Sequence, residues 1–203
     1  MRVLITGFDA FGKDDYNPTF EAIKLMDTAN NNLELVKLEL PTKFIAAKEQ
    51  LLSHLDKNTY DAIILTGQAA GRSEVTLEKY TLNIMNSKIE DNDQYQPRDQ
   101  VITAAGPDLY ASGLDLSSMA SYLSSNDIPS SISYHAGTFV CNSTYYSLLN
   151  YIKEHKLSSQ GLFVHVPIID QQVKNYKADT PFVSLEHIVK AFEVIIKFLE
   201  NNL

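Results

Sequence analysis

The sequence has one cysteine, no long hydrophobic run and no cluster of lysines. A single cysteine excludes a framework of intramolecular disulfides. No apolar stretch is long enough to cross a bilayer, and the amino-terminal segment stops being apolar too early for a secretory signal. Because lysines are scattered through a chain of net charge -8, no surface for nucleic acid or an anionic membrane is indicated. We therefore expect a cytoplasmic protein without nucleic-acid or membrane partners.

Internal repeats, low-complexity tracts and linkers are also missing. No group of histidines and carboxylates has the spacing of metal ligands, so we expect no metal and no other cofactor. A chain of 203 residues is long enough to bury a hydrophobic core without staples. We expect residues 1–203 to form a single domain.

Apolar strands alternate with amphipathic helices along the chain. Strand patterns occupy residues 2–6, 33–40, 61–66, 76–85, 130–134 and 161–167, and helical patterns occupy residues 19–27, 44–55, 116–124, 143–152 and 184–199. Asp115 and Ser184 can cap the helices that follow them, whereas residues 86–107 have no periodicity and predict a long loop. The alternation predicts a three-layer α/β/α fold around a largely parallel, twisted sheet.

Cys141 follows the break that Gly137 makes between a strand pattern and a helical pattern. At the start of a helix, unpaired backbone N–H groups and the positive end of the helix dipole favour a thiolate over a thiol. Cys141 is therefore a candidate nucleophile. The alternative is that this lone cysteine is a small buried hydrophobe.

A base for this cysteine is available in His165, which ends an apolar strand pattern. We expect Cys141 and His165 at the carboxyl ends of strands, where catalytic groups of α/β sheets gather. Glu78 is the acidic candidate to orient the imidazole. The alternatives are a structural histidine within the sheet and a surface carboxylate beside Lys79.

Several loop residues could bind a ligand near these groups. Phe8, Phe11 and Asn17 follow the first strand pattern, although they could equally serve packing. Residues 67–72 form a glycine-bearing turn that lacks the lysine of a P-loop and the spacing of a dinucleotide fingerprint.

Four motifs in order resemble those of the cysteine-type pyroglutamyl peptidases, also called pyrrolidone-carboxylate peptidases. They are residues 6–12 with Asn17-Pro18, residues 67–72 with Glu78 and Asn83, residues 136–142, and residues 163–167. The resemblance runs nearly from end to end, and it implies a fold like that of nucleoside phosphorylases. It also implies a homo-oligomer, either a dimer or a tetramer.

The resemblance implies a Cys141–His165–Glu78 triad. The positions that match the walls of the family's pyroglutamyl pocket are Phe8, Phe11, Asn17, Thr42, Gln68, Ile89, Phe139 and Val140. Tyr80-Thr81 replaces the usual small aliphatic residue and alanine, and Lys88 replaces an arginine. Because lysine lacks the planar fork of arginine, a bidentate contact of relatives would be lost there.

These features predict a cysteine exopeptidase that removes an amino-terminal pyroglutamyl residue from peptides through an acyl-enzyme on Cys141. Pyroglutamate is an uncharged lactam, and the amides of Asn17 and Gln68 can each donate and accept a hydrogen bond at its polar edge. Two alternatives remain: another cysteine amidase or esterase on the same scaffold, and a catalytically silent binding protein.

Overall fold

A six-stranded sheet forms the centre of the structure, a computed structural model that describes residues 1–27 and 33–203. Its strands lie in the order β2 (Glu34–Leu40), β1 (Arg2–Phe8), β3 (Ala62–Gln68), β8 (Gln160–Val166), β4 (Val75–Glu78) and β7 (Ser130–Ser133). Every neighbouring pair is parallel except β4 with β8, which confirms the prediction of a largely parallel sheet. The continuous apolar runs of β1, β3 and β8 suit central strands that are covered on both faces.

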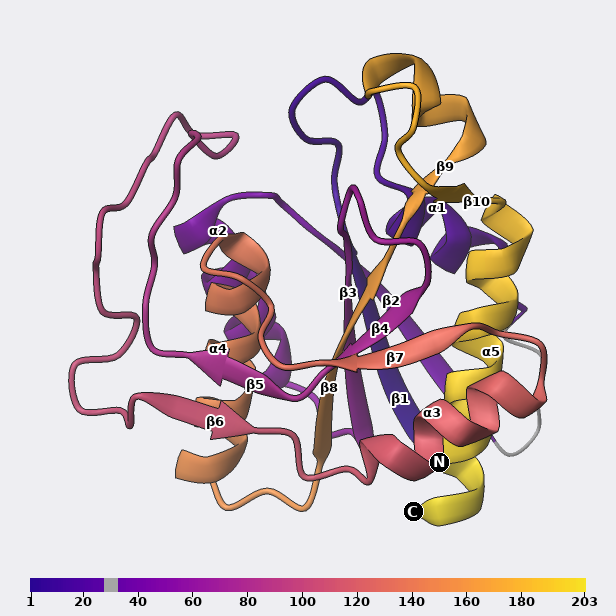
Figure 1. Ribbon diagram of the computed structural model, residues 1–203. Helices are drawn as coiled ribbons and strands as arrows, with labels where there is room; N and C mark the ends of the chain where they lie inside the picture. Colours follow the sequence, from indigo (N-terminus) through magenta and orange to yellow (C-terminus); the bar gives the residue numbers. More distant parts are fainter. Residues whose placement is uncertain (28–32) are drawn as a thin grey trace.

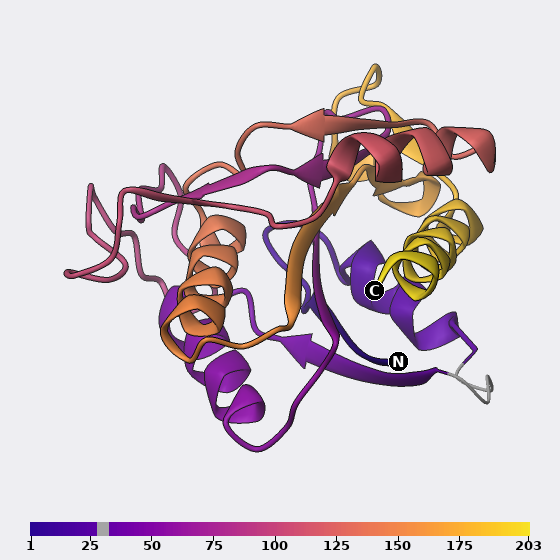
Figure 2. The same cartoon turned by 90° about the horizontal axis from the view of Figure 1, so that it is seen from below.

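Helices cover both faces of this sheet and complete the predicted three layers (Figures 1 and 2). One layer is formed by α2 (Phe44–Leu55) and α4 (Val140–Glu154), and the other by α1 (Pro18–Leu25), α3 (Leu116–Ser125) and α5 (Leu185–Asn202). The side chains of Asp115 and Ser184 accept hydrogen bonds from the first turns of α3 and α5, so both predicted caps are confirmed.

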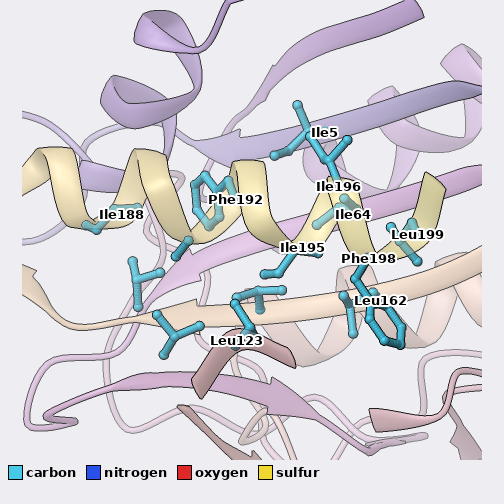
Figure 3. Packing of buried hydrophobic residues seen from close by; sticks show 14 of the residues in the cluster. Ile5, Ile64, Leu123, Leu162, Ile188, Phe192, Ile195, Ile196, Phe198 and Leu199 are labelled. Carbon is cyan, nitrogen blue, oxygen red and sulfur yellow. The ribbon is translucent and has the colours of Figure 1, made fainter. Parts of the chain in front are cut away.

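Two hydrophobic clusters hold the helices to the sheet. On one face, Ile195 and Leu199 of α5 belong to the same buried cluster as Ile64, Leu162 and Leu123 (Figure 3). The opposite cluster joins α2 and α4 to the alternate residues of β1, β3 and β8: Leu4, Phe8, Ile63, Leu65 and Phe163. Each central strand therefore contributes side chains to both layers, as its unbroken apolar sequence requires.

Four short strands form two further two-stranded sheets outside the central sheet. β5 (Tyr80–Leu82) pairs with β6 (Leu109–Ala111), and β9 (Ile168–Ile169) pairs with β10 (Phe182–Val183). A 3-10 helix, Asp170–Asn175, follows β9. The polar stretch 86–107 forms the predicted long loop, with an isolated bridge between Met85 and Gln100.

Two sequence predictions were wrong in this region. The stretch 76–85 is two strands rather than one, because the hydrogen-bonding partners change at Lys79. Its N–H donates to the carbonyl of Ser133 in β7, whereas its carbonyl accepts from the N–H of Ser112, next to β6. Strand β6 was not predicted at all. Its sequence is too short for a period-2 pattern, and β5 supplies its hydrogen-bonding partners.

Candidate active site

Cys141 lies in the first turn of α4, which begins at Val140 after the left-handed turn at Gly137 (φ +79°). The first helical hydrogen bond runs from the N–H of Ser143 to the carbonyl of Phe139. The predicted helix start at this cysteine is thus confirmed. The expected strand end is wrong, since β7 lies at the edge of the sheet and a loop separates it from Cys141.

Asn142 anchors this first turn to the neighbouring segment. Its side-chain oxygen accepts from the N–H of Leu82 and the hydroxyl of Thr81, both at 2.9 Å, and its amide nitrogen donates to the carbonyls of Leu82 and Ile84. Both N–H groups of the Asn142 amide are therefore used. Asn142 therefore fixes the position of Cys141, a role that its place within the motif did not reveal.

The replacement at Thr81 has a structural consequence here. Its hydroxyl, which an alanine would lack, is buried and contacts both the side chain and the carbonyl of Asn142. Tyr80 packs against Tyr134, with ring centroids 6.4 Å apart. Lys88 is exposed on the long loop.

His165 lies near the carboxyl end of β8 and is buried. Its Nδ1 lies 2.7 Å from Oε1 of Glu78, which is fully buried on β4. Since a carboxylate only accepts hydrogen bonds, Nδ1 carries the proton and Nε2 is left as the basic nitrogen. His165 and Glu78 are thus brought together as predicted.

Arg72 is a third member of this cluster that sequence reasoning missed. Its guanidinium lies 2.6 Å from the same Oε1 of Glu78, and it also contacts the hydroxyls of Thr76 and Ser133. Burial alone would raise the pKa of Glu78, but the hydrogen bond from His165, the charge of that imidazole when it is protonated, and the charge of Arg72 hold the pKa below its usual value. The carboxylate therefore stays ionised beside the imidazole.

Cys141 and His165 share one face of the sheet. Gly67 is the register partner of His165 on the adjacent strand, and a Cβ at Gly67 would lie 3.1 Å from both Sγ of Cys141 and Cζ of Phe163. Phe163 lies two residues before His165, and their ring centroids are 4.7 Å apart. The sulfur therefore lies over Gly67, on the side to which the imidazole points.

The close approach at Gly67 yields a testable expectation. In Gly67→Ala the added methyl must displace the thiol or the Phe163 ring by a few tenths of an ångström, so we expect kcat to fall by about tenfold or more. Gly113→Ala is the matched control, since its Cβ meets only the flexible end of Gln160. Equal kcat values for the two variants, measured with thermal unfolding as a check on folding, would contradict this placement of the sulfur.

The ionisation of Cys141 differs from the sequence expectation. Burial raises the pKa of the thiol to about 12, and the charge of Glu78 adds to the rise. Burial also lowers the pKa of His165 below its ordinary value of 6.5, against the opposing effect of Glu78. Desolvation thus outweighs the helix start, and the resting pair is a neutral thiol and a neutral imidazole.

A cavity of about 130 Å³ opens beside the sulfur. It is lined by Phe8, Phe11, Asn17, Thr42, Gln68, Phe139, Val140, Cys141 and Tyr176. Its aromatic wall is braced by Phe44, since Phe139 packs against both Phe11 and Phe44 with ring centroids 5.1 Å apart. Ile89 lies outside this lining and is 55% exposed, so its assignment to the pocket wall stays a prediction.

The two amides of the cavity have opposite polarity, which corrects the expectation that each can donate and accept. Oδ1 of Asn17 caps α1 by accepting from the N–H and hydroxyl of Thr19, which leaves its Nδ2 as a donor. Nε2 of Gln68 donates to Asp14 and Tyr176, while Oε1 accepts one bond from Gln172. Gln68 therefore has only an acceptor to offer.

The part of the chain that the structure describes contains no group of three or more histidine, cysteine or acidic side chains that could hold a metal ion. None of its helices is long and apolar enough to span a membrane.

Comparison with known proteins gives matches along nearly the whole chain. The family model described as pyroglutamyl peptidase matches residues 1–201. A pyrrolidone-carboxylate peptidase of Brachyspira hyodysenteriae is 43% identical over 197 residues, which are 97% of this chain and 98% of the relative.

Solved structures agree with this similarity. Pyrrolidone carboxyl peptidase of Fervidobacterium islandicum superposes with a TM-score of 0.95 at 31% identity and covers 99% of both chains. Pyroglutamyl peptidase I of Bacillus amyloliquefaciens superposes with a TM-score of 0.89 at 37% identity, covering 96% of this chain and 94% of its own.

Proposed function

This chain belongs to the pyroglutamyl peptidase family, and from that premise we propose that Cys141, His165 and Glu78 carry its reaction, the hydrolytic removal of an amino-terminal pyroglutamyl residue from a peptide. The observation that supports this assignment best is the juxtaposition of three features. A thiol lies at the cavity, a buried imidazole lies on the same face of the sheet, and a carboxylate holds the far nitrogen of that imidazole.

The first half-reaction makes an acyl-enzyme. Because the resting thiol is neutral, Nε2 of His165 takes its proton as Sγ of Cys141 attacks the pyroglutamyl carbonyl carbon. The carbonyl oxygen becomes an oxyanion, which backbone N–H groups around Cys141 in the first turn of α4 can stabilise. His165 then returns the proton to the leaving amine as the C–N bond breaks, leaving a thioester.

The second half-reaction releases the acid. Water gives a proton to Nε2 of His165 and attacks the thioester carbonyl, and collapse of the intermediate expels the Cys141 sulfur, which regains the proton. Glu78 transfers no proton in either half. It keeps Nδ1 of His165 protonated and stabilises the imidazolium that forms in each transition state.

The cavity accounts for selection of the ring. Phe8, Phe11, Phe139 and Val140 enclose its apolar atoms. Asn17 presents a donor for the lactam carbonyl and Gln68 presents an acceptor for the lactam N–H. The same complementarity does not exist for an open glutaminyl or glutamyl terminus.

Substrate comparison tests this function. We expect hydrolysis of pyroglutamyl-alanyl peptides and no detectable hydrolysis of glutaminyl- or glutamyl-alanyl equivalents. An uncyclised terminus would bring an ammonium group into a cavity with no acidic lining residue among those described, and an unpaired buried charge is costly. Asp14 lies outside this lining, and its carboxylate already accepts hydrogen bonds from Tyr176, Asn175 and Gln68.

The measurement is kcat/KM for each peptide by chromatographic detection of the released alanyl peptide. Comparable values for cyclised and uncyclised peptides would overturn the proposal of ring recognition. Turnover of unrelated acyl amides, but not of pyroglutamyl amides, would instead favour another amidase on this scaffold. Binding without turnover of any of them would favour a silent binding protein.

The homo-oligomeric state and the cytoplasmic location are also proposals. The first rests on the family resemblance, and the second on the composition of the chain.

A further inference from the structure

A hydrogen-bonded network surrounds the side-chain amide of Gln68 at the end of β3. Its Nε2 donates to Oδ2 of Asp14 at 3.1 Å and to the hydroxyl of Tyr176 at 2.7 Å, while Tyr176 itself donates to the same Oδ2 at 2.6 Å. On the opposite side, Nε2 of Gln172 donates to Oε1 of Gln68 at 2.9 Å. These partners come from two segments of the chain, the loop after β1 and residues 172–176, which meet over one amide.

The segments are held together independently of Gln68. Asn175, at the end of the 3-10 helix, donates to Oδ1 of Asp14 at 2.9 Å and to the carbonyl of Lys13. Asp14 is buried, whereas its neighbour Asp15 is exposed. The loop after β1 and the segment around Tyr176 therefore form one wall of the cavity, and Asp14, which is not itself a lining residue, joins them.

The network permits one orientation of the Gln68 amide. The Asp14 carboxylate only accepts, and because Tyr176 spends its proton on Asp14, its oxygen also faces Gln68 as an acceptor. Gln172 is fixed as a donor because its own oxygen accepts from the N–H of Ile169. A flipped Gln68 would set its oxygen against the carboxylate and its NH2 group against that of Gln172, which leaves polar groups unpaired.

A fixed orientation determines what Gln68 can offer to a ligand. Both of its N–H groups are used by the protein, and one lone pair of Oε1 remains. The N–H of a lactam ring can donate a hydrogen bond to that lone pair. A lactone ring of the same shape has an oxygen at this position, which cannot donate. Sites that are built to hydrogen-bond a donor reject analogues that lack it much more strongly than apolar walls do.

We propose that Asp14, Gln172 and Tyr176 are positioning residues that lock the Gln68 amide, and that this lock makes the enzyme specific for a ring that carries an N–H. The proposal rests on the function proposed above, because it assumes that the pyroglutamyl ring occupies this cavity. It assigns a role in specificity to three residues that do not touch the reacting carbonyl.

The experiment compares two fluorogenic amides of 7-amino-4-methylcoumarin, one acylated by pyroglutamate and one by the corresponding five-membered lactone acid. The readout is the ratio of their kcat/KM values, in which any general loss of activity cancels. We expect the wild-type protein to prefer the lactam by roughly 10²-fold to 10⁴-fold.

Asp14→Asn replaces an acceptor-only group by one that can also donate, so the Gln68 amide is no longer held in one orientation. We expect the lactam preference to fall by about tenfold, which is what the loss of one hydrogen bond of about 1.4 kcal/mol corresponds to. Asp15→Asn is the matched control and should keep the wild-type ratio, because it removes the same charge from an exposed neighbour.

Tyr176→Phe provides a second variant if Asp14→Asn does not fold. It frees one N–H of Gln68 and should lower the ratio in the same direction, with Tyr110→Phe as control, since that hydroxyl bonds Asn150 away from the cavity. An unchanged ratio in a folded Asp14→Asn or Tyr176→Phe protein that still cleaves the lactam overturns the lock alone. A wild-type protein that cleaves neither amide overturns the proposed function, and the lock with it.

Discussion

Cys141→Ala is expected to abolish hydrolysis of pyroglutamyl amides, with a loss on the order of 10⁴-fold to 10⁶-fold, as for removal of a nucleophile that acts as one unit with its base. The sulfur forms the acyl bond, and a methyl group cannot replace it. The loss should appear in kcat, because Cys141 is only one of nine residues that line the cavity. A thermal unfolding midpoint near that of the wild type, together with retained binding of a pyroglutamyl product, would show that the fold survives.

Chemical labelling tests the same residue through its ionisation. Because burial raises the pKa of the thiol to about 12, the thiolate is a small fraction at neutral pH. Each unit of pH below that value lowers this fraction tenfold, so the rate of inactivation by iodoacetamide should climb steadily from pH 7 to pH 9 without a plateau. Inactivation should proceed in step with alkylation of this one thiol, the only one in the chain.

Two results would contradict this account. Undiminished turnover by Cys141→Ala would remove the nucleophile from the mechanism. A labelling rate that is already constant near pH 7 would indicate a preformed thiolate, and the proton transfer to His165 would then precede attack instead of accompanying it.

The architecture could be predicted from the sequence because periodicity reports burial directly. β1, β3 and β8 are apolar without interruption, and α5 carries one apolar stripe, so the layers follow from the need to cover both faces of the sheet. The separate two-stranded sheet of β5 and β6 could not be predicted in this way, since three-residue strands have no measurable period and depend on the partner that the fold brings to them.

The candidate triad could also be proposed from the sequence, although its residues were identified mainly by the family motifs and less by physical arguments. Cys141, His165 and Glu78 lie apart in the chain. The pairing of β4 with β8 brings Glu78 to His165, and the start of α4 places Cys141 over Gly67, the register partner of His165. The ionisation of Cys141 was beyond sequence reasoning. A helix start is visible in the sequence, but the burial that outweighs it arises from the packing of α4 over β3 and β8.

The residues that orient the Gln68 amide could not be recognised from the sequence either. Asp14 and Tyr176 lie 162 positions apart, in segments without regular periodicity, and nothing local marks either of them as part of a site. The sequence could suggest that Gln68 binds a ligand. Whether its amide donates or accepts depends on partners that only the folded chain supplies.

His165→Ala is expected to lower kcat by about 10⁴-fold to 10⁶-fold, because the thiol of Cys141 is neutral at rest and its attack needs a base to take the proton. Glu78→Gln should retain more activity. Its amide oxygen can still accept from both Nδ1 of His165 and Arg72, as Oε1 does now, and its NH2 group would occupy the place of Oε2, which has no hydrogen-bond partner among the described residues. The tautomer is kept and the charge is lost, so we expect a decrease of about 10²-fold.

The pH dependence of kcat/KM distinguishes the role of His165 as the base from the role of Glu78 as the carboxylate that orients it. The basic form of His165 is required, and burial holds its pKa below 6.5, so wild-type kcat/KM should stay high until the pH falls below that value. The Glu78 charge opposes this shift by favouring the protonated imidazole. Its removal in Glu78→Gln therefore lowers the pKa of His165 further and should move the acid limb to still lower pH. An acid limb that stays in place or moves upward in Glu78→Gln would show that this carboxylate does not act on the imidazole, even if the variant proved slow.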